Sequence, residues 1–175
     1  MNRSVTATAP GKVIIFGEHA VVYGQPAIAA PVHQAQATAT VEPGEPGSGL
    51  ILSAADLDLV LPLTEAPKDD PLAAMARLTL AYLDAPAPDA TLTVRSTVPI
   101  ASGMGSGAAV STAIVRALAA WMGRELRADV VSGLVYEVEK LHHGTPSGID
   151  NTVSATSKCS VAPTSKVSMG CPRTK

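Results

Sequence analysis

A glycine-rich segment joins the clearest strand pattern of the chain to its clearest helix pattern. Residues 91–98 alternate between apolar and polar side chains, as a strand with one buried face does. Small and apolar residues then recur with helical spacing over 106–122, and Gly123 ends that pattern. Glycines occupy positions 103, 105 and 107, where the strand pattern gives way to the helix. The sequence therefore predicts a tight turn directly ahead of a long helix.

This turn has the properties of an anion-binding loop. Closely spaced glycines let a ligand approach the backbone without interference from Cβ atoms. The free N–H groups of the first helical turn then favour a negatively charged group. A phosphate is the predicted ligand. A simple tight turn, with small residues that allow close helix packing, is the other interpretation of the same residues.

Two other phosphate-binding patterns can be tested by their spacing. A Walker loop ends in Gly-Lys-Ser/Thr, but the sequence has no lysine between residues 69 and 139. Gly103-x-Gly105-x-x-Ala108 does match the dinucleotide fingerprint, and Glu125 lies about 20 residues downstream. In that fold the acidic residue ends a second parallel strand, whereas 124–127 here only separates two helix patterns. A nicotinamide-binding domain stays as a less favoured alternative.

Two carboxylates flank a loop in the last third of the chain. Glu139 lies near the end of a helix predicted over 129–143, and Asp150 follows a segment rich in glycine and proline. The two could meet, one to hold a cation and the other to accept a proton. Glu139 and His142 also form a Glu-x-x-His pair, but a di-iron bundle needs further copies on other helices, which the sequence lacks. Taken alone, Asp150 is equally consistent with a helix N-cap.

Three ionisable residues interrupt an apolar segment near the N-terminus. Residues 5–22 predict two short strands around the turn at Pro10-Gly11, and Lys12, Glu18 and His19 lie among them. An unpaired charge is costly to bury. These side chains therefore either face solvent or line a polar site.

The order of the patterns predicts an α+β fold with a mixed sheet. Strand-like segments dominate the first part, a helix starts at Asp70-Pro71, and two longer helices follow. A net charge of −2 and a low aromatic content argue against nucleic-acid binding. No apolar run approaches the roughly 20 residues of a membrane span. The N-terminus does not resemble a signal peptide, so a cytoplasmic protein is expected.

The last 22 residues differ from the rest of the chain. All 15 acidic residues lie at or before Asp150, and both cysteines, Cys159 and Cys171, lie beyond it. Serine, threonine, lysine and proline dominate this segment without a hydrophobic period. The sequence predicts that residues 154–175 form a disordered tail, in which the cysteines are incidental.

Three motifs in order resemble those of the GHMP small-molecule kinases: Pro10–Gly24, Pro99–Ala109 and His143–Asn151. The combination of GKVIIFGEHAVVYG with HGTPSGIDN is most similar to the mevalonate kinases of that family. The resemblance covers residues 4–153, the N-terminal half of the usual chain. It implies the N-terminal GHMP domain, with a ribosomal protein S5 domain 2-like fold and helices on one side of the sheet. The C-terminal GHMP domain would be absent.

The resemblance also implies a reaction and a role for each motif. The family uses ATP and Mg²⁺, and its mevalonate kinases phosphorylate the 5-hydroxyl of mevalonate in isoprenoid precursor synthesis. Asp150 would take the hydroxyl proton and Lys12 would stabilise the reacting oxygen, while Glu18 and His19 would complete the mevalonate site. Glu139 and Ser106 would hold Mg²⁺. The implied ATP-binding residues are Pro99, Ala101, Ser102, Gly103, Met104, Gly105, Ser106, Gly107, Ala108 and Ala109. A homodimer of the full-length protein is expected on the same ground.

Two departures from the family pattern accompany these expectations. Gly107 stands where the family usually has a second serine that supplies a hydroxyl to Mg²⁺. The resemblance also stops after Val153, which suggests a shifted reading frame or a truncated gene. A non-catalytic nucleotide-binding remnant is therefore an alternative function. Another GHMP kinase, acting on phosphomevalonate, homoserine or galactose, is a further alternative.

Overall fold

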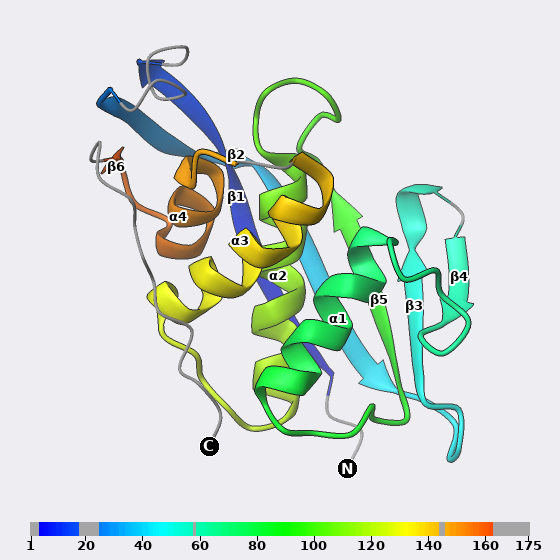
Figure 1. Cartoon of the computed structure of the whole chain (residues 1–175). Coiled ribbons are helices and arrows are strands. Elements are labelled where there is room, and N and C mark those ends of the chain that lie inside the picture. The colour runs from blue at the N-terminus through cyan, green and yellow to red at the C-terminus, as the bar shows by residue number, and fades with distance from the viewer. Residues whose placement is uncertain (1–3, 18–24, 58, 144–145, 163–175) are drawn as a thin grey trace.

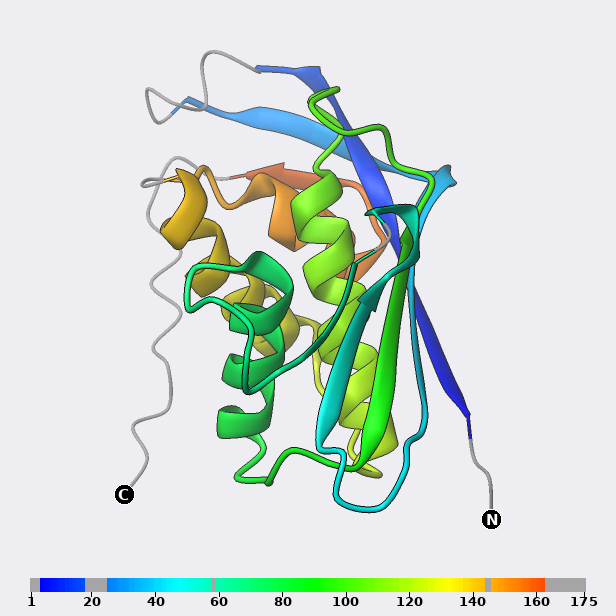
Figure 2. The same ribbon diagram turned by 90° about the vertical axis from the view of Figure 1, so that its right-hand side faces the viewer.

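The computed structural model describes residues 4–17, 25–57, 59–143 and 146–162 as one mixed β-sheet with α-helices on one face (Figures 1 and 2). The strands are β1 (Val5–Phe16), β2 (Ala27–Pro43), β3 (Leu50–Ala54), β4 (Leu59–Pro62), β5 (Ala90–Ser96) and β6 (Ser160–Ala162). The helices are α1 (Pro71–Tyr82), α2 (Ser106–Trp121), α3 (Ala128–His143) and α4 (Ile149–Thr156), with a short 3₁₀ turn at Ala55–Leu57. The predicted α+β class with a mixed sheet is confirmed.

The sheet has the order β1-β2-β5-β3-β4, and β6 pairs with the first residues of β2, Ala27 to Ala29. All neighbours are antiparallel except β3 and β5. Successive side chains of β2 alternate between faces, so Ala37, Ala39 and Val41 are buried while Thr38 and Thr40 are partly exposed. The alternation leaves one face for helix packing and a threonine-rich face toward the outside.

The N-terminal segment differs from its prediction. Pro10-Gly11 is not a turn between two short strands but an irregularity within one 12-residue strand, β1. At this point the partner of β1 jumps from Gln36 to Val32, so that β2 carries extra residues. The irregularity bends the far ends of β1 and β2, which together with β6 curl over α4 (Figure 2). Ala27 and Ala29 pack there against Ile149 and Val153 of α4.

The helices begin and end close to where the sequence predicts. Asp70 is the N-cap of α1, because its Oδ1 accepts a hydrogen bond from the Ala73 amide at 2.8 Å, and Pro71 follows it. The long helix α2 lies against β1 and β2, and α1 and α3 pack on it from the side away from the sheet. Its buried face carries many alanines, which let the helix backbone approach the strands closely. The position of α2 fixes the glycine-rich loop at one end of the sheet.

The structure corrects the prediction for part of the C-terminal segment. Residues 154–162 are not a disordered tail: α4 continues to Thr156, and β6 pairs with β2. Residues 163–175, including Cys171, lie outside the described residues, and Cys159 is exposed as a free thiol. A domain boundary at residue 153 stays a prediction.

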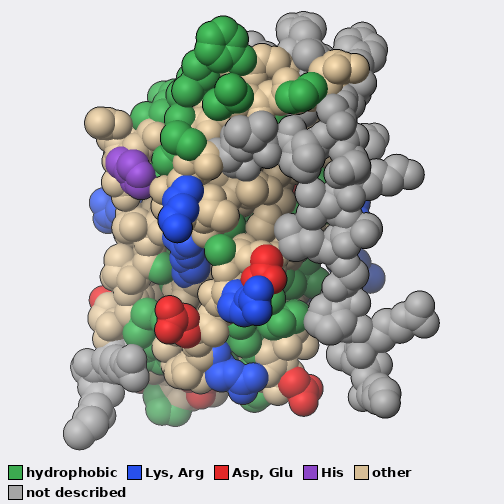
Figure 3. Space-filling model, turned by 90° about the vertical axis from the view of Figure 1, so that its left-hand side faces the viewer, with side chains coloured by type: hydrophobic (Ala, Val, Ile, Leu, Met, Phe, Trp, Pro, Cys, Tyr) green, Lys and Arg blue, Asp and Glu red, His purple; other side chains and the backbone are tan. Residues whose placement is uncertain are grey.

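Exposed apolar side chains gather near one end of the molecule. Figure 3 shows hydrophobic side chains concentrated at the upper end of the space-filling view. Val13, Ile15, Phe16 and Ile28 are exposed on the curled ends of β1 and β2, and Ile100 is exposed in the loop before α2. Among the helices of the described residues, none is long and apolar enough to cross a membrane.

Candidate active site

The loop that connects β5 to α2 lines a cavity of about 240 Å³. Gly103 and Gly105 have φ values of +73° and +67°, a region that glycine enters without a Cβ penalty. No side-chain cap hydrogen bond is made at the start of α2. The first amide N–H groups of a helix have no acceptor within it, so those of α2 face the loop and its cavity. This arrangement is what an anion-binding helix start requires.

The residues predicted to bind ATP gather around this cavity. All of them line it except Ala109, which is fully buried in the core beneath the helix start. Ser102 Oγ donates to the carbonyl of Pro99 at 2.7 Å, which closes the outer part of the loop. Ser106, the first residue of α2, also lines the cavity.

Lys12 lies beneath the loop and contacts it twice. Its backbone N–H donates to the carbonyl of Met104 at 2.9 Å, and its Nζ donates to the carbonyl of Gly103 at 2.8 Å. The preceding residue is Gly11, where a Cβ atom would come within 3.1 Å of the Met104 oxygen. The bend in β1 and the missing side chain at Gly11 therefore bring Lys12 directly under the loop. Lys12 is 5% exposed, and among the described residues it is the one cation that lines the cavity.

Asp150 supplies the negative partner of Lys12. Its Oδ1 lies 3.1 Å from Lys12 Nζ, and its side chain is 28% exposed. Gly148, at φ +79°, is the N-cap of α4 and turns the chain so that Asp150 falls in the first helical turn. A carboxylate in this turn is stabilised by the helix dipole. The sequence left an N-cap role for Asp150 open; the N-cap is Gly148.

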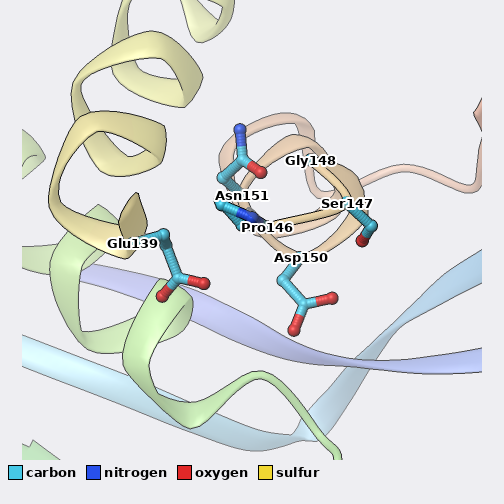
Figure 4. A pocket seen from close by; sticks show the side chains of 6 residues that line it. All are labelled: Glu139, Pro146, Ser147, Gly148, Asp150 and Asn151. Atoms are coloured by element: carbon cyan, nitrogen blue, oxygen red, sulfur yellow. The ribbon is translucent and has the colours of Figure 1, made fainter. Parts of the chain in front are cut away.

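Glu139 brings a second carboxylate to the same place. It lines both the loop cavity and an adjoining cavity of about 180 Å³, and Asp150 lines both as well. Figure 4 shows the two carboxylates, from α3 and α4, directed toward the start of α2. A Cβ atom at Gly107 would lie 3.2 Å from Glu139 Oε1, so the first turn of α2 comes very close to Glu139. Glu139, Asp150 and Lys12 therefore converge on one helix start.

Several residues that hold α4 in place were not found from the sequence. Ser154 Oγ donates to the carbonyl of Pro10 at 3.0 Å. Arg116 of α2 donates to the carbonyl of Ala155 at 2.7 Å and to that of Thr8 at 3.1 Å. Burial lowers the pKa of Arg116 from its ordinary value. These contacts tie the C-terminal half of α4 to β1 and α2, and they thereby hold the helix that carries Asp150 in its first turn.

Two predicted site residues, Glu18 and His19, lie outside the described residues. The side chain of His142 lies outside them as well. Among the described residues, no group of three or more acidic, histidine or cysteine side chains could hold a metal ion by itself. Two carboxylates do suit Mg²⁺, which is usually held by one or two carboxylates together with phosphate oxygens and water.

The described part of the chain does not have the arrangement of a nicotinamide-binding domain. After α2 the chain forms α3 and α4, whereas the dinucleotide fingerprint needs a parallel strand that ends in the acidic residue. Glu125 is exposed in the connection between α2 and α3. This alternative from the sequence is wrong.

Comparison with known proteins supports the resemblance seen in the motifs. The mevalonate kinase of Thermococcus gammatolerans is 35% identical over 167 residues, which cover 86% of this chain and 49% of that protein. The crystal structure of the Methanococcus jannaschii mevalonate kinase matches with a TM-score of 0.84 and 27% identity, over 93% of this chain and 54% of that chain. The L. major mevalonate kinase in complex with R-mevalonate matches with a TM-score of 0.69 and 27% identity, over 93% and 52%.

These matches cover only about half of the length of each relative. The sequence pattern described as "GHMP kinases N terminal domain" matches residues 71–158, which include α1, β5, the glycine-rich loop and the helices that carry Glu139 and Asp150. The chain therefore belongs to the GHMP kinase family and has the fold of its N-terminal domain.

Proposed function

We propose that this chain forms the ATP-binding part of a kinase that transfers the γ-phosphoryl group of ATP to the 5-hydroxyl of mevalonate. One observation carries the proposal: the Lys12–Asp150 ion pair lies directly beside the start of α2, where no side chain caps the helix. An anion-binding helix start holds phosphates, and an adjacent carboxylate accepts a proton. Phosphoryl transfer needs positioned phosphates, charge neutralisation and an oriented nucleophile. In this proposal the helix start positions the phosphates, Lys12 neutralises charge, and Asp150 orients the substrate hydroxyl.

In this proposal each residue has a separate task. The loop from Gly103 to Ala108 and the α2 amides bind the phosphates of ATP. Asp150 accepts the proton of the substrate hydroxyl. The hydroxyl oxygen then forms a bond to the γ-phosphorus, while the bond between the γ-phosphorus and the oxygen that leaves with ADP breaks. Lys12 neutralises charge on the transferred group, and it also holds the loop through Gly103.

Glu139 is the residue best placed to hold Mg²⁺, with Ser106 nearby at the start of α2. When bound, Mg²⁺ neutralises the charge that develops on the phosphates. The donor set fits this ion, since Glu139 supplies a carboxylate and Ser106 a hydroxyl at the cavity, and phosphate oxygens and water would supply the remaining ligands.

The choice of mevalonate as acceptor rests on the relatives. Curated relatives such as the Thermococcus gammatolerans protein are mevalonate kinases, and one of the solved relatives is described with R-mevalonate. The solved galactokinase and phosphomevalonate kinase matches are only 16% and 18% identical, so they support the fold alone. Mevalonate is therefore favoured over phosphomevalonate, homoserine and galactose.

A coupled assay of ADP release tests the proposal. We expect ADP release with mevalonate that exceeds the release with homoserine, galactose or phosphomevalonate. Asp150→Asn preserves the shape of the side chain but removes the base, and should lower turnover by about 10²- to 10⁴-fold. ATP binding without turnover on any acceptor would instead indicate a nucleotide-binding module. Equal turnover by Asp150→Asn and wild type would contradict the role of Asp150.

A further inference from the structure

A buried amide joins the two helices that carry the carboxylates. Asn151 is 4% exposed and follows Asp150 directly at the start of α4. Its Nδ2 donates to the carbonyl of Ser132 at 3.0 Å and to Ser132 Oγ at 2.9 Å. Ser132 belongs to α3 and is 2% exposed. One side chain therefore makes two hydrogen bonds across the α3–α4 interface, shielded from water.

This contact lies on the same side of α3 as Glu139. Ser132 and Glu139 are seven residues apart, which is close to two helical turns, so they face the same direction. On the other helix, Asn151 and Asp150 are adjacent. Thr152 reinforces the arrangement, because its Oγ1 lies 3.5 Å from Ser132 Oγ and donates to the carbonyl of Gly148 at 2.6 Å. The amide thus connects the two helices two turns from one carboxylate and one residue from the other.

We propose that Asn151 is a positioning residue: its paired hydrogen bonds to Ser132 fix the placement of Asp150 relative to Glu139. The role rests on the proposed function, in which these carboxylates serve the same Mg²⁺-dependent reaction. If α4 slid or rotated against α3, the Asn151 amide would lose its partners inside a buried interface, which is costly. An apolar side chain of similar size would fill the space but would accept several positions. The amide therefore selects one alignment.

A spectroscopic measurement tests the alignment without any need for activity. Spin labels are attached to Lys140→Cys in α3 and Ser147→Cys just before α4, two exposed positions, with Cys159 and Cys171 replaced by serine. In the Asn151→Leu background we expect a broader distribution of interspin distances than in the parent. The control is Leu52→Ala, a buried residue of β3 that lines neither cavity and should leave the distribution unchanged. An unchanged distribution in Asn151→Leu would overturn the proposal.

A binding measurement tests the consequence for the site. ATP is titrated into the full chain with Mg²⁺ and, separately, with EDTA. Residues that orient metal ligands contribute about tenfold or more to metal affinity. The factor by which Mg²⁺ raises the affinity for ATP should therefore be about tenfold smaller in Asn151→Leu than in the parent. Binding in EDTA should stay close to that of the parent, since the loop and α2 are untouched. Leu52→Ala should keep the full gain, and a full gain in Asn151→Leu would contradict the positioning role.

The two tests separate this inference from the proposed function. If the parent chain does not bind ATP, the proposed function fails, while the spin-label experiment still decides whether Asn151 aligns the helices. If Asn151→Leu does not fold, Ser132→Ala carries both tests, because it removes one of the two acceptors and keeps the carbonyl. For Ser132→Ala we expect a smaller broadening of the interspin distances and a smaller loss of Mg²⁺-dependent ATP affinity. If Ser132→Ala behaves like the parent in both tests, the inference is overturned.

Discussion

A side chain at Gly105 would begin 3.2 Å from Oδ2 of Asp150, although 45 residues separate the two in the sequence. Gly105 is the N-cap of α2, and Asp150 lies in the first turn of α4. Lys12 fills the remaining side of this contact, with its Cγ also 3.2 Å from that Cβ position. The start of α2 therefore lies so close to the ion pair that we assign to catalysis that even a Cβ atom at Gly105 would press against both residues.

Gly107→Ser tests whether the missing hydroxyl weakens Mg²⁺ binding. The new Cβ would lie 3.2 Å from Glu139 Oε1, so a small shift of the Glu139 side chain would accommodate the serine and bring its hydroxyl to the carboxylate. We expect a several-fold lower Mg²⁺ concentration for half-maximal ATP binding. Gly107→Ala is the matched control, since it adds the Cβ without the hydroxyl and should not improve binding. Mg²⁺ dependence that is the same in all three proteins would contradict the prediction.

Thr112→Val should stabilise the protein by about 1 kcal/mol, because it removes a buried hydroxyl that has no partner. Thr112 Oγ1 is buried in α2 without a hydrogen bond in the structure. Thr79 provides the control: it is also fully buried, but its hydroxyl donates to the carbonyl of Met75 at 2.7 Å. Urea unfolding of both valine variants measures the difference. If Thr112→Val destabilises the chain as much as Thr79→Val does, the hydroxyl has a partner.

Asp89 should contribute stability that disappears in acid. Its carboxylate accepts hydrogen bonds from the amides of Gly47 and Gly49 at 2.9 and 2.8 Å, which lowers the pKa of Asp89 below its ordinary 3.8. A lowered pKa in the folded state stabilises the fold above the unfolded value, and this contribution is lost as the pH falls through the folded pKa.

Unfolding curves of Asp89→Asn at several pH values check this sign. The variant should be less stable than the parent at neutral pH, and the difference should shrink as the pH drops below 3.8. Glu45→Gln removes a charge from the same exposed turn and should behave like the parent. A constant difference between Asp89→Asn and the parent across this range would count against the hydrogen bonds as its source.

The sequence predicted those elements that have local signals. Asp70 and Pro71 identify the start of α1, and the glycines mark the start of α2, because capping and positive φ depend on single residues. Pro10-Gly11 was misleading, since the same residues suit a turn or an irregularity within a strand, and only the pairing with β2 decides between them. α4 and β6 gave little signal, because α4 is short and its buried face mixes Ile149 and Val153 with small or polar residues.

In the candidate site, too, the sequence identified some residues and missed others. Lys12, Glu139, Asp150 and the loop have chemistry that the sequence displays, and the structure brings them together. The residues that hold them in place form hydrogen bonds with backbone atoms far away in the sequence. Ser154 donates to the carbonyl of Pro10, 144 residues away, and Arg116 donates to the carbonyl of Thr8, 108 residues away. No spacing in the sequence reveals such contacts.

The most direct measurement is a titration of ATP·Mg²⁺ into the wild type, Gly105→Ala and Gly123→Ala. Both glycines have positive φ, at opposite ends of α2, so both variants strain the backbone and should lose stability. Only Gly105 faces Lys12 and Asp150; a Cβ at Gly123 meets nothing within 4 Å. We predict that the wild type and Gly123→Ala bind ATP and that Gly105→Ala loses most of its affinity. Equal binding by all three proteins, or by none, would contradict a phosphate site at the start of α2.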